Sequence, residues 1–301
     1  MSEPIQHGSI IGGVVAVPDL EAALADYHGR LGFALVERGV VPAELAASWG
    51  IPGLVGKTMA MLQPTSGAHC FIRLIEQPLP TDFVPTTTYG WASYEITVQK
   101  VFGWPGKIAG SAFEIIGPPK EIPGLPYFVA MQVHGSGKEV LYFNETRSMT
   151  PSSDLPFAQS PMDHIFIVIL AAPDRAAAVG WYRDRLKLDV GDTYTIAYSM
   201  INNAFGLPDD NLSSLTMVQH GRMPIVEIDD YPAQAKARRA DPGCLPPGNS
   251  LVTLMVDNLD ALALDWISPP TRQPGPLYNG ARAATVVGPA GELLELVELA
   301  C

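Results

Sequence analysis

Glu295 is the residue with the clearest chemical signal, because it is a carboxylate inside an otherwise apolar segment. The stretch 292–299 alternates as a strand should, since successive side chains leave a strand on opposite faces. Leu293, Glu295 and Val297 therefore share one face. A carboxylate between two aliphatic side chains on a core-facing strand is costly unless something binds it. A metal ion is one such partner, and the alternative is a wet strand end that leaves Glu295 solvated.

Other side chains that could do chemistry lie in the second half of the chain. His164 stands near the start of an apolar strand at 163–169, where it could also be a hydrogen-bonded structural histidine. Glu227 precedes Asp229 in a further strand, and it could instead belong to an acidic surface cluster. His220 comes just before the Gly221 turn and is expected to be exposed.

Composition restricts the class of protein. The chain has 301 residues, 47% of them hydrophobic and 17% charged, which is a globular composition long enough for two domains with full cores. The net charge of −12 disfavours a nucleic-acid partner, because an acidic surface repels phosphate backbones. No apolar run reaches membrane-spanning length, so we expect no membrane partner.

Cysteine usage and the N-terminus bear on location. Cys70, Cys244 and Cys301 are scattered and form no CxxC pair, and the segment 1–4 lacks the layout of a signal peptide. We therefore expect a reduced, cytoplasmic protein. Cys244 has no basic neighbour in sequence, so a catalytic thiol is not expected there.

The predicted elements follow a recurring order of one strand, one helix and three strands. Asp19 and Asp174 are expected to cap helices, and further helices are expected at 43–49, 101–110, 201–205 and 258–266. The predicted strands are 10–17, 33–41, 58–63, 70–76, 91–98, 113–116, 128–133, 139–144, 163–169, 192–199, 212–219, 223–229, 250–256, 281–287 and 292–299.

Three anchors indicate an internal repeat, which predicts that the halves are duplicates with two βαβββ units each. The pattern Tyr-x-x-Arg-Leu recurs at Tyr27 and Tyr182, an offset of 182 − 27 = 155. The segment 50–52 matches 206–208, and 71–75 matches 224–229. We expect residues 1–147 to form one two-module domain, 148–160 a linker, and 161–301 a second two-module domain.

Two segments of the chain resemble motifs of the vicinal oxygen chelate superfamily, which includes glyoxalase I, bleomycin resistance proteins and extradiol dioxygenases. The segment 17–33 is close to the opening V-x-D-L…F-Y-x-x-x-L-G-F of the family, and 288–298 is close to its closing D-P-x-G…I-E-L-V-E. The resemblance covers essentially the whole chain. It implies an α+β fold of four tandem modules, with two paired, cup-shaped, mostly antiparallel sheets and the helices outside.

The resemblance also implies where metal ligands would stand, on the first and last strands of each module. Those positions fall near Gly12, Arg73, Ser93 (or Ala92) and Tyr142 in the first half, so we expect an N-terminal cup without metal. In the second half they fall at His164, Glu227 and Glu295, while the fourth position, at 249–251, lacks a ligand. This set implies a divalent ion such as Fe, Mn, Ni or Zn, and the alternative is that no metal is bound.

The implied function is that of a metal-dependent enzyme acting on a small aromatic or carbonyl compound. Glu295 or Glu227 would shuttle a proton, and Tyr198, His220 and Tyr278 would contact the substrate. The ligand set favours isomerase or lyase chemistry over ring cleavage, because extradiol dioxygenases use two His and one Glu. The alternative is a metal-free binding protein of the bleomycin-resistance type, and a homodimer is possible in either case.

Overall fold

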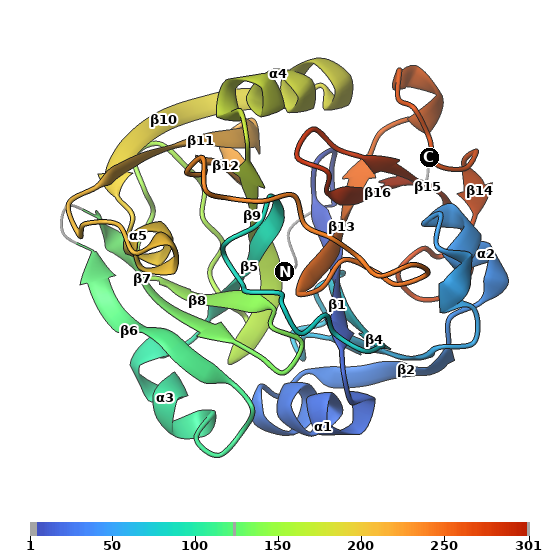
Figure 1. The fold of residues 1–301 in the computed structure, drawn as a ribbon, viewed down its shortest axis with the longest axis horizontal. Coiled ribbons are helices and arrows are strands. Elements are labelled where there is room, and N and C mark those ends of the chain that lie inside the picture. The colour runs from blue at the N-terminus through green and yellow to red at the C-terminus, as the bar shows by residue number, and fades with distance from the viewer. Residues whose placement is uncertain (1–4, 123–124, 300–301) are drawn as a thin grey trace.

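A computed structural model describes residues 5–122 and 125–299, and these form two eight-stranded curled sheets that lie side by side (Figure 1). The predicted α+β fold with four βαβββ modules is confirmed. Residues 1–4 and Cys301, which entered the expectation about location, lie outside the described residues. Among the described residues, no helix is long and apolar enough to cross a membrane.

The first sheet has the order β14-β15-β16-β13-β1-β4-β3-β2 and combines the first module with the fourth. Its strands are β1 (Ile10–Val17), β2 (Ala34–Val40), β3 (Thr58–Gln63), β4 (Phe71–Glu76), β13 (Asn249–Val256), β14 (Thr271–Arg272), β15 (Arg282–Val287) and β16 (Leu293–Glu298). We call its concave side the one-four cup.

The second sheet has the order β10-β11-β12-β9-β5-β8-β7-β6 and combines the second module with the third. Its strands are β5 (Gly90–Val98), β6 (Glu114–Ile122), β7 (Leu125–His134), β8 (Val140–Thr146), β9 (Met162–Ala172), β10 (Asp189–Ala197), β11 (Leu212–His220) and β12 (Met223–Asp230). We call its concave side the two-three cup.

The sheets are therefore not divided along the two halves of the sequence. The expectation that the first half builds one cup and the second half another is wrong, because β1 pairs with β13 and β5 pairs with β9. The repeat indicates which segments are modules, but it contains no information on which modules pair. The boundary at 148–160 separates the second module from the third, and its role as a domain linker stays a prediction.

The two sheets pack against each other through their central strands. The Tyr94 hydroxyl lies 2.8 Å from the carbonyl oxygens of both Val14 and Leu251, so β5 is tied to β1 and β13. Gly13 permits this contact, because a Cβ atom there would lie 2.7 Å from the Tyr94 ring. Apolar side chains from both sheets form one core around this seam.

Helices cover the outside of the sheets and the mouths of the cups. They are α1 (Leu20–Leu24, continued as a π-helical turn over Ala25–Arg30), α2 (Ala43–Ser48), α3 (Trp104–Lys107), α4 (Arg175–Leu186) and α5 (Ser199–Phe205). Short 3-10 turns lie at Pro52–Leu54, Val101–Gly103 and Leu259–Ala261. In Figure 1, α1, α3 and α4 lie outside the sheets, whereas α2 and α5 lie at the open sides of the cups.

The predicted caps are confirmed, and one predicted helix is wrong. Asp19 accepts a hydrogen bond from the Ala22 amide at 3.0 Å, and Asp174 accepts one from the Ala177 amide at 2.9 Å. The helix expected at 258–266 is only a 3-10 turn. Directly after this segment the backbone pairs with another element, since the Ile267 amide donates to the Thr285 carbonyl.

One buried contact occurs twice, at matching positions of the two halves. The Tyr27 hydroxyl donates to Glu139 at 2.7 Å, and the Tyr182 hydroxyl donates to Glu292 at 2.8 Å. Each pair ties the first helix of a half to the turn before the last strand of that half. The tyrosines are the same two residues that anchor the sequence repeat.

Candidate functional site

Glu295 lies in the one-four cup, fully buried and fully hydrogen-bonded. One carboxylate oxygen accepts from Trp49 Nε1 and from the Tyr278 hydroxyl, each at 2.8 Å. The other accepts from Arg73 at 2.7 Å and from the Thr253 hydroxyl at 2.8 Å. Four donors thus surround the carboxylate that the sequence singled out.

Arg73 supplies the positive charge that this carboxylate requires. The guanidinium is also fully buried, lies over the Trp49 ring at 4.8 Å, and donates to the Tyr278 hydroxyl at 2.5 Å. Burial alone would raise the pKa of Glu295, but the Arg73 charge and the hydrogen bonds outweigh it, so this pKa lies below its usual value. The residues here do not fit a metal ion, because the cation position is already filled.

Glu227 lies in the other sheet and faces the two-three cup. Its strand β12 pairs with β9 so that Glu227 lies opposite Ile169, and Ile169 lies opposite Ser93 on β5. The Tyr198 hydroxyl, just before α5, donates to Glu227 at 3.1 Å. Tyr142 on β8 lies 3.3 Å from the Tyr198 hydroxyl and completes this wall of the cup.

Two further carboxylates share the two-three cup with Glu227. Asp229 follows it on the same face of β12, and Glu95 projects from β5 toward Asn144, whose amide nitrogen donates to it. All three carboxylates are buried, with exposed fractions of 7% for Glu95, 6% for Glu227 and 1% for Asp229. No arginine or lysine appears among their hydrogen-bond partners in the described part of the chain.

This arrangement shifts the three acids away from their ordinary titration range. Burial raises the pKa of Glu227 to about 7, although the Tyr198 hydrogen bond opposes the shift. Burial and the nearby Glu227 charge raise the pKa of both Glu95 and Asp229 well above the usual values. The cup therefore holds protons near neutral pH that isolated carboxylates would release.

A small cavity adjoins this cluster. Its volume is about 10 Å³, enough for about one water molecule. It is lined by Thr86, Ala92, Ser93, Val140, Tyr142, Ile169, Tyr198, Met200, Ile201, Asp229 and Tyr231. Among the residues that the structure describes, three buried polar atoms of this region have no hydrogen-bond partner: Ser93 Oγ, Asn144 Oδ1 and Asp229 Oδ1. Asn144 Oδ1 can only accept, so a donor or a cation would satisfy it.

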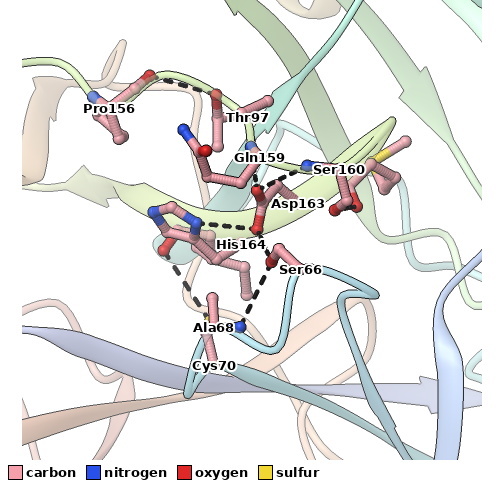
Figure 2. Close-up of polar contacts among 12 residues, drawn as sticks. Ser66, Ala68, Cys70, Thr97, Pro156, Gln159, Ser160, Asp163 and His164 are labelled. Atoms are coloured by element: carbon pink, nitrogen blue, oxygen red, sulfur yellow. Dashed lines mark hydrogen bonds and ion pairs between the residues drawn. The ribbon is translucent and has the colours of Figure 1, made fainter. Parts of the chain in front are cut away.

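His164 and His220 lie in neither cup. Both line a groove of about 540 Å³ at the junction of the N-terminal segment, the start of β9 and the β11–β12 hairpin. His164 Nδ1 lies 3.2 Å from Asp163 Oδ1 (Figure 2). The hydrogen-bonded histidine considered from the sequence is thus what the structure shows.

The comparisons with known proteins agree with this architecture. Glyoxalase I from Zea mays superposes with a TM-score of 0.61 at 16% identity, over 96% of this chain and 92% of that one. A Bacillus subtilis (subsp. subtilis str. 168) protein described as a candidate dioxygenase superposes with a TM-score of 0.60 at 10% identity, over 98% and 86%. No protein-family model and no curated protein matches the sequence.

This chain has the vicinal oxygen chelate fold. Within that fold, the six predicted site residues separate into three places: Glu295 and Tyr278 in the one-four cup, Glu227 and Tyr198 in the two-three cup, and His164 and His220 in the groove. The predicted trio of His164, Glu227 and Glu295 is therefore not brought together. Within residues 5–122 and 125–299, no three His, Cys, Asp or Glu side chains are placed to hold a metal ion.

Glu95, Asp229 and Asn144 were not predicted from the sequence as members of one cluster. A signal for Glu95 was present, because it is a carboxylate inside the apolar strand 90–98, as Glu295 is in its own strand. Its partner Glu227 lies 132 positions away (227 − 95 = 132), and only the pairing of β5 with β9 brings them together.

Proposed function

We propose that the protein is an enzyme that acts on a small carbonyl or aromatic compound in the two-three cup, with Glu227 transferring a proton. The observation that carries the proposal is the cluster of three buried carboxylates without a cationic partner. Glu227 is its best acid–base candidate, because its pKa of about 7 lies near physiological pH, where a general base or acid is most effective.

The walls of the cup support a small, oxygen-bearing substrate. The hydroxyls of Tyr142 and Ser93 can donate to a carbonyl or enolate oxygen, and Ile169 and Ile201 supply apolar surface. Because the cavity has a volume of only about 10 Å³, substrate entry requires that α5 move away from the mouth.

The donor types in this cup are those that a hard divalent cation prefers, although the side chains are not placed to hold one within residues 5–122 and 125–299. Asn144 Oδ1, Asp229 Oδ1, Glu95 and Glu227 would have to move closer together before an ion such as Mn²⁺ or Mg²⁺ could bind through oxygen alone. Such an ion would supply Lewis acidity toward a substrate oxygen. The cluster contains no imidazole, so the two-His-one-carboxylate set of iron oxygenases is not what these residues offer, and isomerase or lyase chemistry is favoured.

Deuterium exchange tests the proposal without requiring the physiological substrate. The protein is incubated in D₂O with methylglyoxal and dihydroxyacetone, and exchange of the carbon-bound protons beside the carbonyl is followed by NMR. We expect the wild type to catalyse exchange, and we expect the exchange rate to fall by about 100-fold or more in Glu227→Gln, which is the usual contribution of a positioned base. The exposed Glu44→Gln serves as the matched control.

Metal dependence is a separate arm of the same experiment. The protein is treated with EDTA and assayed before and after addition of Mn²⁺ or Mg²⁺. Recovery of exchange with metal supports the oxygen-ligand set, whereas undiminished exchange after EDTA supports Glu227 acting alone. Equal exchange in the wild type and Glu227→Gln would overturn the assignment of Glu227.

A metal-free binding function is the second candidate, and the Arg73–Glu295 pair favours it. In that pair a buried side-chain cation neutralises the carboxylate of the one-four cup without a metal ion. If the protein binds a hydrophobic fluorescent probe in the presence of EDTA but exchanges no protons from any of the carbonyl compounds, this alternative replaces the enzyme.

A further inference from the structure

The groove that contains His164 and His220 is separate from both cups and large enough for a small organic molecule. Its volume of about 540 Å³ falls within the range of typical ligand sites. Five parts of the chain line it: residues 5–11, residues 68–70, Asp154, the start of β9, and the β11–β12 hairpin. Four of the six histidines of the chain are among the lining residues: His7, His69, His164 and His220.

His164 is held in one orientation by Asp163. The carboxylate of Asp163 accepts from the Ser66 hydroxyl at 2.6 Å and from the Ser160 amide at 3.1 Å, and its side chain is only 1% exposed. Figure 2 shows these contacts converging on Asp163 from the loop of Ser66 and from the segment before β9, with the His164 ring on the remaining side. The imidazole therefore cannot turn without losing its partner.

This arrangement determines which nitrogen of His164 is available. Burial alone would raise the pKa of Asp163, but the hydrogen bonds from His164, Ser66 and the Gln159 amide outweigh it, and this pKa lies below its usual value. An anionic Asp163 accepts the proton of Nδ1, so Nε2 carries the lone pair. No partner of Nε2 is found among the described residues, and the side chain is 20% exposed.

The other polar groups of the groove limit the kind of ligand. Arg222 already donates to Asp154 at 3.0 Å and to the carbonyls of Pro151 and Thr150, so it offers no free cation for a carboxylate. Asp163 is saturated and buried, so it offers no acceptor for an ammonium group. Gln6, Ser9 and His69 also line the groove, but none of them is a carboxylate or an ammonium group. The remaining requirement is a hydrogen-bond donor for Nε2.

Apolar side chains form part of the walls around His164. Phe166 and Ile225 are 6% and 2% exposed, and Ile11 is 1% exposed. On the far wall, His7 is fixed by the Leu186 carbonyl at 2.7 Å, and its ring lies 5.7 Å from that of His220. A flat ring with one acidic hydroxyl matches this combination of surfaces.

We propose that this groove is a second binding site, specific for a small phenol whose hydroxyl donates to His164 Nε2. The proton of that hydroxyl is shared with, or moves to, Nε2, and the oxygen keeps the electron pair of the broken O–H bond. Asp163 is a positioning residue that stabilises the resulting imidazolium. The site is independent of the carboxylate cluster in the two-three cup.

The test uses the full chain and 4-nitrophenol, whose phenolate has its own visible absorption band. Calorimetry gives the affinity, and absorbance gives the fraction of bound probe in the phenolate form. We expect one bound probe per chain and a loss of affinity of about tenfold or more in His164→Ala, as for a hydrogen bond with charged character. His134→Ala, which changes a histidine on β7 outside the groove, should bind as the wild type does.

Two further variants make the outcome decisive. In Asp163→Asn the bound probe should shift away from the phenolate form, an effect that a merely structural role would not produce. In Glu227→Gln binding should be unchanged. Absence of binding at millimolar probe, binding that His164→Ala leaves intact, or binding that Glu227→Gln abolishes would each overturn the proposal, and circular dichroism confirms that every variant is folded.

Discussion

At the scale of single residues, the same sequence signal leads to two different environments. Glu295 and Glu227 are both carboxylates in apolar strands, and both are buried. Glu295 is neutralised by Arg73 and by three neutral donors, so it stays charged and serves stability. Glu227 has a tyrosine and two more acids around it, and its raised pKa is the basis of the proton transfer that we propose for it. The partners decide the role of each carboxylate.

The Arg73–Glu295 pair is open to a direct test. Arg73→Met should destabilise the protein by about 3–5 kcal/mol in urea unfolding, because it leaves a buried charge without its partner. Arg73→Met combined with Glu295→Gln should recover part of that loss, since glutamine still accepts from Trp49 without carrying charge. The exposed pair Arg38–Glu21 is the control, where Arg38→Met should cost less than about 1 kcal/mol. A double variant no more stable than Arg73→Met would contradict the pairing.

The acid cluster predicts a pH dependence with a definite sign. The pKa of Glu227 rises from 4.5 to about 7 on folding, so the folded state holds more protons in that window. The stabilising contribution is complete below pH 4.5 and is lost as the pH rises to 7, a change of about 3 kcal/mol. Unfolding free energies of the wild type and Glu227→Gln, measured from pH 5 to 8, should therefore diverge, with the flatter curve in the variant. Parallel curves would show that folding does not shift the pKa of Glu227.

At the scale of elements, the short helices α2 and α5 occupy equivalent places at the mouths of the two cups. Trp49 follows α2 and donates to Glu295, whereas Tyr198 precedes α5 and donates to Glu227. Both helices are followed by a glycine with positive φ, Gly50 at 70° and Gly206 at 62°. In each cup, a residue next to the helix thus donates a hydrogen bond to the buried glutamate.

These two glycines provide a matched comparison. Gly206→Ala should lower the free energy of unfolding by about 1–2 kcal/mol, which is the penalty of a left-handed backbone for a residue with a Cβ atom. No steric term is added, because no described atom lies within 4 Å of the new Cβ. Gly50→Ala should cost more, since its Cβ would also lie 2.5 Å from Ile267. Thermal unfolding of both variants measures the difference, and Ile267→Ala should reduce it. Equal costs at the two positions would rule out the steric contribution.

At the scale of the whole molecule, the four modules form one interdependent structure. Each sheet takes one module from each half of the chain, and Tyr94 ties the two sheets together at the seam. Neither half can complete a cup alone, which differs from the two independent domains expected from the repeat. The homodimer and the cytoplasmic location stay predictions.

Fragments test this interdependence. Residues 1–157 and 158–301, produced separately, should each be unfolded or self-associated, because every central strand would lack its native partner. Mixed together, they should recover the circular dichroism of the intact chain. Light scattering coupled to size exclusion makes the distinction, and a folded monomeric half would support the independent domains instead.

The sequence by itself determined the local structure and the fold class. Period-2 alternation and the Asp19 and Asp174 caps predicted nearly all strands and both main helices, because these signals act over a few residues. Only the tertiary structure decided which modules pair and which side chains meet. Arg73 meets Glu295, and Glu95 meets Glu227, across long separations in sequence. Burial, charge and orientation at such sites depend on distant neighbours, so the isolated segments carry no information on them.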